Sequence, residues 1–378
     1  MHKLKKLLGK ILIGTMLLTF TGATNLVINA ADTTNPYIKL YLDNKASVNS
    51  TASVNQQKVE PIVDPQIEEQ IIIATLEDYY KSDKEVANVL KKYINYSDLN
   101  EDTLSIKKED KISIMRKIKQ VYSQVKSNDD QKILKDYLGR YVINSGDDDL
   151  ISFFNKLNPP AKSIRTDLNI QDKEKYGEVS TTGINATAVY KGTYTGGLAG
   201  DWAYNNYNKY STSFPAFHNN NNYGSDCTNF VSQAMYFGGG MPFQENWYCF
   251  MKNPTYLNPT SANELNFSWT LSDPSPWISV KEFRDFWMYK AVGTYYCTKS
   301  DYVANHVTQY TKPIRKGDVI VLHKGIADFI TVPTHCMIIS RYDTVNKDFL
   351  LAGHSNERQS HPLLTAIDSY ACVEFITF

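Results

Sequence analysis

Apolar residues recur at helical spacing between residues 67 and 157 of the 378-residue chain. The first run places apolar side chains on one face of a helix, at Ile67, Ile71, Ile72, Leu76 and Tyr79. Similar amphipathic runs follow over residues 112–125, 132–142 and 150–157, and two prolines end the pattern at 159–160. The pattern predicts a mostly α-helical domain over residues 66–160. This block has no cysteine and no histidine, so we interpret it as a spacer or a prosegment.

The last third of the chain carries short apolar runs bounded by turn residues, a pattern typical of β-strands. A turn over residues 313–318 leads into an apolar run at 319–322, and further runs begin at Thr334 and Asp348. A final run covers residues 370–377. These runs predict an antiparallel sheet in a second domain over residues 198–378. The expected fold class is therefore α+β.

Two polar segments separate these parts of the chain. Residues 31–65 are rich in Thr, Asn, Ser, Val and Gln without an apolar period, and we expect a flexible spacer. Residues 161–197 are rich in Thr and Gly, which is typical of a linker. On this division, we expect residues 196–378 to fold without the helical domain.

The amino terminus has the pattern of a secretory signal peptide. A basic leader with four lysines precedes an apolar run over residues 11–23, and Ala30 offers a small residue for cleavage. The run is too short for a membrane-spanning helix, which needs about 20 apolar residues. We expect residues 1–30 to be removed, the protein to be extracellular or cell-wall associated, and no stable membrane insertion afterwards.

Charge and cysteine content further limit the partners and the reactive groups that we expect. Without residues 1–30 the chain has 36 basic and 40 acidic side chains, which argues against nucleic acid as a partner. Five cysteines are an odd number, so at least one thiol stays unpaired even in an oxidising location. All five cysteines and six of the seven histidines lie beyond residue 200, where the chemistry is therefore expected.

The segment around Cys227 combines a turn, a capping residue and the start of an amphipathic helix. Gly224 and Ser225 break the preceding loop, and Asp226 can cap free backbone N–H groups. Cys227 then falls in the first helical turn, where the helix dipole lowers a thiol pKa and favours the thiolate. The segment predicts a nucleophile, with a buried structural cysteine as the alternative.

His335, at the start of the second predicted strand, is the candidate base. If residues 343–346 form a four-residue hairpin loop, the register places His335 opposite His354. His354 would then orient the imidazole, and its neighbour Asn356 on the same strand face is the alternative orienter. Taken alone, His335 is better explained as an ordinary histidine at a strand end than as a catalytic residue.

These residues resemble a known family. The block Asp-Cys-Thr-Asn-Phe-Val-Ser-Gln at 226–233 is similar to the putative amidase domain family of secreted bacterial proteins, related to papain-like cysteine/histidine-dependent cell-wall amidases and peptidases. Further matching features are Tyr204-Asn205, Gly238-Gly239, Trp269, Trp277 and His354-Ser355-Asn356. The resemblance covers residues 198–378. The chain departs from it at Asn206, where the family usually has arginine, and at Ser355, where we expect threonine.

The resemblance implies a papain-like catalytic domain, with the nucleophile helix packed on an antiparallel sheet. It implies Cys227 as the nucleophile, His335 as the base and a third polar residue within 354–356. The expected activity is hydrolysis of an amide in a cell-wall or extracellular peptide substrate, through a thioester. A thiol acyltransferase with the same residues, or a catalytically silent wall-binding module, are the alternatives.

Other candidate residues favour structural interpretations. Cys336 and Cys372 are expected in the core, and Cys249 and Cys297 are possible disulfide partners of unknown geometry. No histidine spacing suits a zinc site and residues 147–149 lack the pattern of a calcium loop, so no metal or cofactor is expected. The tryptophans are interpreted mainly as packing residues, with a binding groove as the alternative.

Overall fold

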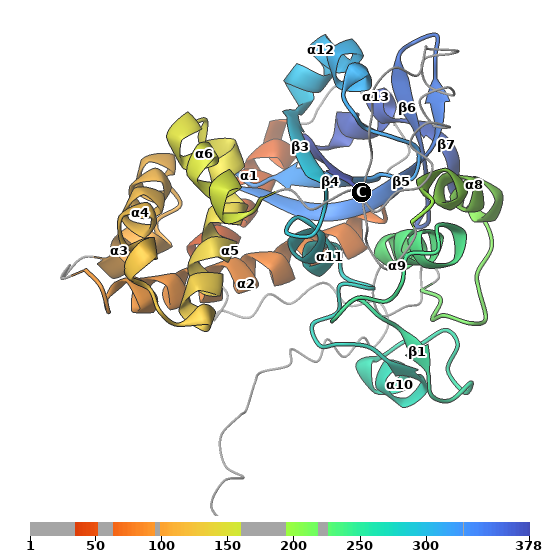
Figure 1. The fold of residues 1–378 in the computed structure, drawn as a ribbon, viewed down its shortest axis with the longest axis horizontal. Coiled ribbons are helices and arrows are strands. Elements are labelled where there is room, and N and C mark those ends of the chain that lie inside the picture. The colour runs from red at the N-terminus through yellow and green to blue at the C-terminus, as the bar shows by residue number, and fades with distance from the viewer. Residues whose placement is uncertain (1–34, 52–62, 95–98, 160–193, 218–225, 328) are drawn as a thin grey trace, which may run out of the picture.

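The computed structural model describes residues 35–51, 63–94, 99–159, 194–217, 226–327 and 329–378. Figure 1 shows helices α1 to α6 gathered on one side of a central sheet. The predicted signal peptide and most of the predicted linker lie outside the described residues. Among the helices that the structure describes, none is both long and apolar enough to span a lipid bilayer.

The amino-terminal region is helical, as predicted. Its elements are α1 (Pro36–Thr51), α2 (Pro65–Leu90), α3 (Leu99–Leu104), α4 (Lys108–Val121), the short 3-10 helix η2 (Tyr122–Gln124), α5 (Asn128–Ser145) and α6 (Asp148–Leu157). Asp64 caps α2 by accepting from the Gln66 amide at 2.8 Å, and Ser127 and Asp147 cap α5 and α6. The acidic run at 147–149 is therefore the start of a helix.

Helix α1 corrects the prediction of a flexible spacer over residues 31–65. Asn35 caps its first turn by accepting from the Tyr37 amide at 3.0 Å. Tyr37 is fully buried, and its hydroxyl hydrogen-bonds to the buried carboxylate of Asp83 on α2. Ile38 is buried in the same core, and Lys45 of α1 pairs with Glu69 of α2 at 2.5 Å. These contacts depend on residues of α2 that are distant in the sequence.

The carboxy-terminal region is built on a six-stranded antiparallel sheet. Its order is β3 (Gly293–Thr298), β8 (Cys372–Thr377), β4 (Val319–Gly325), β5 (Thr331–Asp343), β6 (Asp348–Gly353) and β7 (Arg358–Pro362). A separate two-stranded ribbon joins β1 (Phe250–Met251) to β2 (Trp269–Thr270) beside α10 (Ala262–Ser268). The expected mixed α+β class is confirmed, and the papain-like subclass stays a prediction.

Helices cover both faces of the large sheet. One face packs against α8 (Gly196–Asn206), α9 (Asp226–Gln233), its π-helical extension η3 (Ala234–Gly238) and α11 (Val280–Trp287). The other face packs against α12 (Lys299–Thr311), α13 (Leu363–Ala366) and η4 (Ile367–Ser369). Figure 1 shows α9 and α11 below the sheet and α12 and α13 above it. Trp247, Trp269 and Trp277 are at most 1% exposed, so they serve packing, not a groove.

The β5–β6 hairpin corrects the predicted register. Asp343 pairs with Asp348, so the loop is residues 344–347. The Asp343 carboxylate accepts from the Val345 and Asn346 amides, at 3.1 and 2.9 Å, which fixes it at the strand end. A further irregularity lies at Ser340, and β6 ends at Gly353. The predicted pairing of His335 with His354 is therefore wrong, because His354 lies in the turn after β6.

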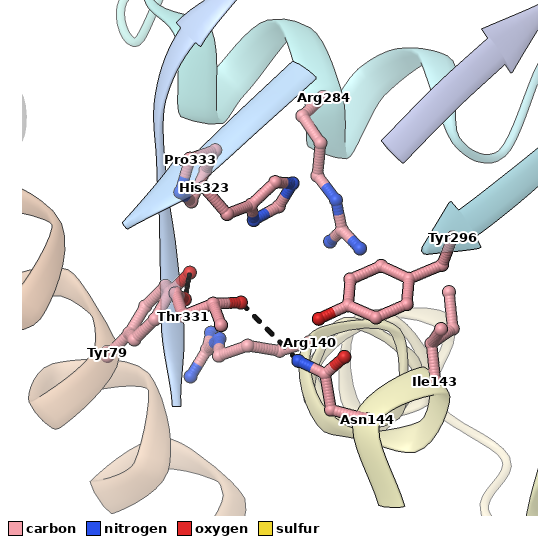
Figure 2. A pocket seen from close by; sticks show the side chains of 9 residues that line it. All are labelled: Tyr79, Arg140, Ile143, Asn144, Arg284, Tyr296, His323, Thr331 and Pro333. Atoms are coloured by element: carbon pink, nitrogen blue, oxygen red, sulfur yellow. Dashed lines mark hydrogen bonds between the residues drawn. The ribbon is translucent and has the colours of Figure 1, made fainter. Parts of the chain in front are cut away.

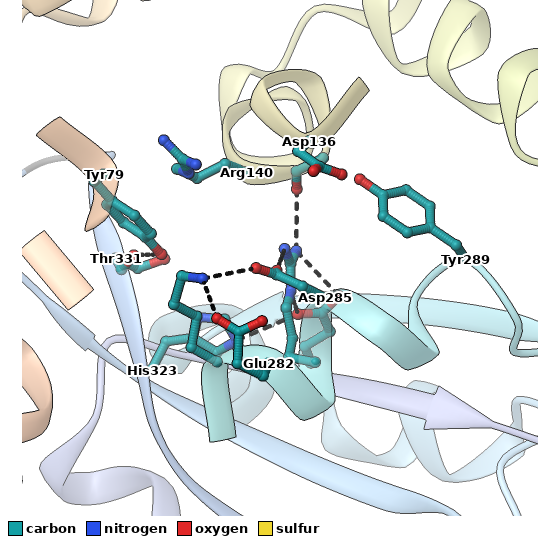
Figure 3. Close-up of polar contacts among 12 residues, drawn as sticks. Tyr79, Asp136, Arg140, Glu282, Asp285, Tyr289, His323 and Thr331 are labelled. Carbon is teal, nitrogen blue, oxygen red and sulfur yellow. Dashed lines mark hydrogen bonds and ion pairs between the residues drawn. The ribbon is translucent and has the colours of Figure 1, made fainter. Parts of the chain in front are cut away.

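The helical region and the sheet share a buried interface. The tip of the β4–β5 hairpin packs inside the helical core through Ile326, Phe329, Ile330 and Val332. Figure 3 shows the polar side of this contact. Arg284 on α11 binds Glu374 on β8 at 2.8 Å and donates to the Gly139 carbonyl of α5 at 3.1 Å. The two regions are therefore joined by apolar and ionic contacts.

Candidate active site

Cys227 is the second residue of α9, in the first helical turn as the sequence predicts. Every residue of α9 is buried, and Cys227 is 1% exposed. Asp226, the residue before it, accepts from the side-chain amide of Asn229 at 2.6 Å and from the Phe217 amide at 3.2 Å. These bonds fix the start of the helix, and with it the position of the thiol.

His354 is tied to this helix start and not to His335. Its Nδ1 lies 2.5 Å from the Asp226 carboxylate, and its Nε2 lies 3.4 Å from the Asn206 carbonyl oxygen. The ring packs against Phe230 on α9, with centroids 4.1 Å apart. Both partners of the ring are hydrogen-bond acceptors. The Asn206 contact uses the backbone, so the departure from the family arginine does not remove it.

His335 is fully buried on β5. Strand alternation directs it to the side of its partner Leu322, opposite to Cys336, which faces α9. Neither ring nitrogen has a hydrogen-bond partner, and the part of the chain that the structure describes contains no hydrogen bond from this ring to Cys227. The preceding residue, Thr334, is the extra residue of a β-bulge between β5 and β4.

Asn356, the alternative orienter, lies in the turn between β6 and β7 and is half-buried. This turn holds Ser355 and Glu357 at positive φ, so the chain there is not an extended strand. The predicted sharing of one strand face by His354 and Asn356 is therefore wrong.

Sequence reasoning missed two residues, Glu68 and Tyr370, which lie near the start of β5. Glu68, in the first turn of α2, binds Thr334 Oγ1 at 3.2 Å and Lys324 Nζ at 3.1 Å. Burial raises the pKa of Tyr370, as do the charges of Glu68 and Cys227 and a hydrogen bond to Glu68. Glu68 shows no catalytic signal in the sequence because it belongs to an ordinary amphipathic helix.

Residues 193–376 match the family model described as Putative amidase domain. This part of the chain belongs to that family. The match includes α8, α9 and nearly the whole large sheet, and it excludes the helices α1 to α6. The family indicates amide hydrolysis. No curated protein and no solved structure matches the chain.

The remaining thiols of the amidase domain suit packing better than nucleophilic attack. All five cysteines are free and buried, so Cys249 and Cys297 do not form the disulfide considered from the sequence. They lie in different apolar clusters, on opposite faces of the sheet. Burial raises the pKa of Cys249, and it raises those of Cys297 and Cys372 to about 12. Such thiols are almost entirely protonated at neutral pH.

Cys336 occupies the core, as predicted, but it also lies beside the candidate nucleophile. Its Sγ lies 3.4 Å from Thr228 Oγ1, and Cys227 Sγ lies 3.7 Å from the same oxygen. Burial raises the pKa of Cys336, and the hydrogen bond to Cys227 and the charge of that thiolate raise it further. The sequence could have indicated this position, because successive residues of a strand point to opposite faces of the sheet. A strand that turns His335 away from α9 therefore turns Cys336 toward it.

A small cavity lies where the amidase domain meets the helical region (Figure 2). Its lining includes Tyr79, Arg140, Asn144, Arg284 and His323, and its volume is about 10 Å³. Burial lowers the pKa of His323 despite the nearby Glu374 carboxylate. The space suits one water molecule and is too small for a substrate. Within the described residues, no group of three or more His, Cys, Asp or Glu side chains is arranged to hold a metal ion.

Proposed function

We propose that this protein is a cysteine-dependent amidohydrolase or peptidase with Cys227 as its nucleophile. The observation that carries the proposal is the position of Cys227 in the first turn of α9, at a helix start fixed by Asp226. Free N–H groups and the positive end of the helix dipole favour a thiolate there. The same backbone amides are suited to stabilise the oxyanion of a tetrahedral intermediate.

In the proposed reaction, Cys227 Sγ attacks the carbonyl carbon of the substrate amide. His335 takes up the thiol proton and delivers it to the departing amine, which leaves a thioester on Cys227. A water molecule, deprotonated by His335, then hydrolyses the thioester and releases the acid. Within the described residues, neither nitrogen of the His335 ring has a hydrogen-bond partner. Strand alternation turns the His335 ring to the sheet face opposite to α9, so this role requires the strand segment that carries His335 to rearrange when substrate binds.

His354 is the rival for the role of base, and its contacts argue against it. Its two nitrogens face the Asp226 carboxylate and the Asn206 carbonyl, so neither is free to receive the thiol proton. We propose instead that His354 positions the nucleophile by holding Asp226.

We propose a cell-wall amide or an extracellular peptide as the substrate, and secretion as the route to it. Both follow from the resemblance and from the leader-like amino terminus. The acyltransferase alternative uses the same thioester but passes the acyl group to an amine. A silent wall-binding module would bind the same material without turnover.

The test is mass spectrometry of purified bacterial cell wall after incubation with the protein. We expect new free amino and carboxyl ends with wild type and none with Cys227→Ala, while Cys249→Ala, which removes another buried thiol, keeps activity. Products joined to an added amine would indicate an acyltransferase. Full activity of Cys227→Ala would refute the proposal.

A further inference from the structure

Cys227 and Cys336 approach each other across the contact between α9 and β5. Both sulfur atoms lie against the hydroxyl of Thr228, Cys227 at 3.7 Å and Cys336 at 3.4 Å. Cys227 also raises the pKa of the Cys336 thiol, through a hydrogen bond and through its charge. Cys336 is fully buried and Cys227 is 1% exposed. The candidate nucleophile therefore has a second thiol as a direct neighbour.

The other cysteines have different surroundings. Cys297 donates to the Asp301 carboxylate at 2.8 Å, on the opposite side of the sheet from Cys227. Cys249 belongs to the same apolar cluster as Cys227, but its pKa is raised by burial alone. Of the described thiols, Cys336 is the one placed to react with a modified Cys227.

We propose that Cys227 and Cys336 form a reversible disulfide when the protein meets a peroxide, and that this bond switches the nucleophile off. The proposal rests on the proposed function, because it takes Cys227 as the reactive thiol. A reactive thiol beside a resolving cysteine is the arrangement found in redox-sensing proteins. Here the resolving thiol comes from β5.

The chemistry takes place in two balanced steps. The Cys227 thiolate attacks one oxygen of hydrogen peroxide, the O–O bond breaks, and a sulfenic acid and hydroxide form. The Cys336 sulfur then attacks the sulfenic sulfur, the S–O bond breaks, and the Cys336 proton leaves with the oxygen as water. The two thiols are oxidised and the peroxide is reduced to water. Dithiothreitol reverses the change by thiol–disulfide exchange.

The surroundings of the pair favour a disulfide over further oxidation. Because the Cys336 thiol lies against the same Thr228 hydroxyl as Cys227, the sulfenic acid can be captured before a second peroxide arrives. Hydrogen peroxide is also small, so it can reach a nearly buried thiol through smaller openings than a polymeric substrate needs. The bond would protect Cys227 from irreversible oxidation to sulfinic acid.

The test treats the full chain with hydrogen peroxide, removes the excess with catalase, and maps cysteines by peptide mass spectrometry without reduction. We expect a Cys227–Cys336 cross-linked peptide that lacks two hydrogen atoms. Cell-wall hydrolysis should fall by about tenfold or more and return after dithiothreitol.

Two variants test whether Cys336 is the resolving thiol. In Cys336→Ser the first step is intact but the resolving thiol is gone, so excess peroxide should carry Cys227 on to the sulfinic acid. Dithiothreitol does not reduce a sulfinic acid, so activity should not return. Cys249→Ser, which removes a thiol of the same cluster, should behave as wild type. A disulfide between another pair, or Cys227 left as a free thiol or sulfinic acid in wild type, would overturn the inference. The mapping needs no substrate, so activity in Cys227→Ala would refute the proposed function alone.

Discussion

The ion pair between His354 and Asp226 shows how a side chain can serve a catalytic site without touching the substrate. Both side chains are at most 2% exposed, and the ring is enclosed by Phe230 and Tyr210. Removing one partner of a buried pair leaves an uncompensated charge, which typically costs about 3–5 kcal/mol. The same pair fixes the residue next to Cys227, so stability and turnover should change together.

The first prediction compares His354→Ala with Asn356→Ala. We expect His354→Ala to lower the free energy of unfolding by about 3 kcal/mol and to reduce kcat, because the buried Asp226 carboxylate loses its partner. Asn356→Ala, on the same turn but half-buried, should lower the free energy of unfolding and kcat by less. Urea unfolding and initial rates of cell-wall hydrolysis measure the two effects. Near-normal kcat in folded His354→Ala, with kcat lost in Asn356→Ala, would show that Asn356 is the residue that matters.

At the scale of elements, the bulge in β5 connects the helical region to the candidate base. Thr334 is the extra residue of the bulge and immediately precedes His335. Its hydroxyl is held by Glu68 of α2, and bulges near active sites commonly redirect a side chain. Helix α2 therefore supports the strand segment that carries His335.

The second prediction tests this support with Glu68→Ala and Glu68→Gln. The alanine variant removes the carboxylate that binds Thr334 and Lys324, so kcat should fall by about tenfold while KM changes less. The glutamine variant keeps an acceptor for Thr334 and should recover most of kcat. Glu85→Ala, at an exposed position of the same helix, is the matched control. Equal kcat in all variants would show that Glu68 has no part in positioning.

Element prediction from the sequence succeeded where the pattern is local and failed where a distant partner decides. The helices after residue 65 and the main strands follow from their apolar periods. Helix α1 does not, because Tyr37 depends on Asp83 of another helix. The hairpin register was missed because Asp343 side-chain bonds shift the loop by one residue.

For the candidate site too, the sequence predicted local features and missed the contacts between distant segments. Cys227 was predicted at a helix start, since the turn and capping residues are adjacent to it in sequence. The contacts of Asp226 with His354, of Thr334 with Glu68 and of Cys336 with Cys227 join distant segments. No local pattern encodes such contacts without the register and packing of the sheet.

At the scale of the whole molecule, the helical region is part of one structure with the amidase domain. The β4–β5 hairpin tip would expose Phe329, Ile330 and Val332 if the helices were absent. The structure therefore argues against the expectation that residues 196–378 fold alone.

The third prediction concerns that fragment. Residues 193–378 should unfold at lower temperature than the full chain and bind a hydrophobic dye, because the hairpin tip loses its apolar cover. Circular dichroism and dye fluorescence measure this. Replacing Phe329 with Ser in the fragment should reduce dye binding and serves as the control. A fragment as stable as the full chain would show that the interface contributes little.

The fourth prediction concerns acid stability. Burial would raise the pKa of Glu374, but Arg284, with a smaller contribution from His323, lowers it to about 2. An unfolded glutamate titrates near pH 4.3, so the unfolded chain binds the proton first as the pH falls. The stabilisation, about 3 kcal/mol, is complete above that value and is lost toward pH 2.

Urea unfolding between pH 6 and pH 2.5 should therefore show a steeper loss in wild type than in Glu374→Gln, which cannot titrate at this position. Glu85→Gln, at an exposed site, should follow wild type. Identical slopes for wild type and Glu374→Gln would contradict the ionic link between α11 and β8.

The central claim is that Cys227 carries the acyl group during amide cleavage. The most direct measurement is mass spectrometry of the protein after it has been mixed with purified cell wall and quenched in acid, which preserves thioesters. The account predicts an acyl fragment of the substrate on the peptide that contains Cys227, released by hydroxylamine, and no such adduct in Cys227→Ala. An adduct on another residue, or product release by the Cys227→Ala protein, would contradict it.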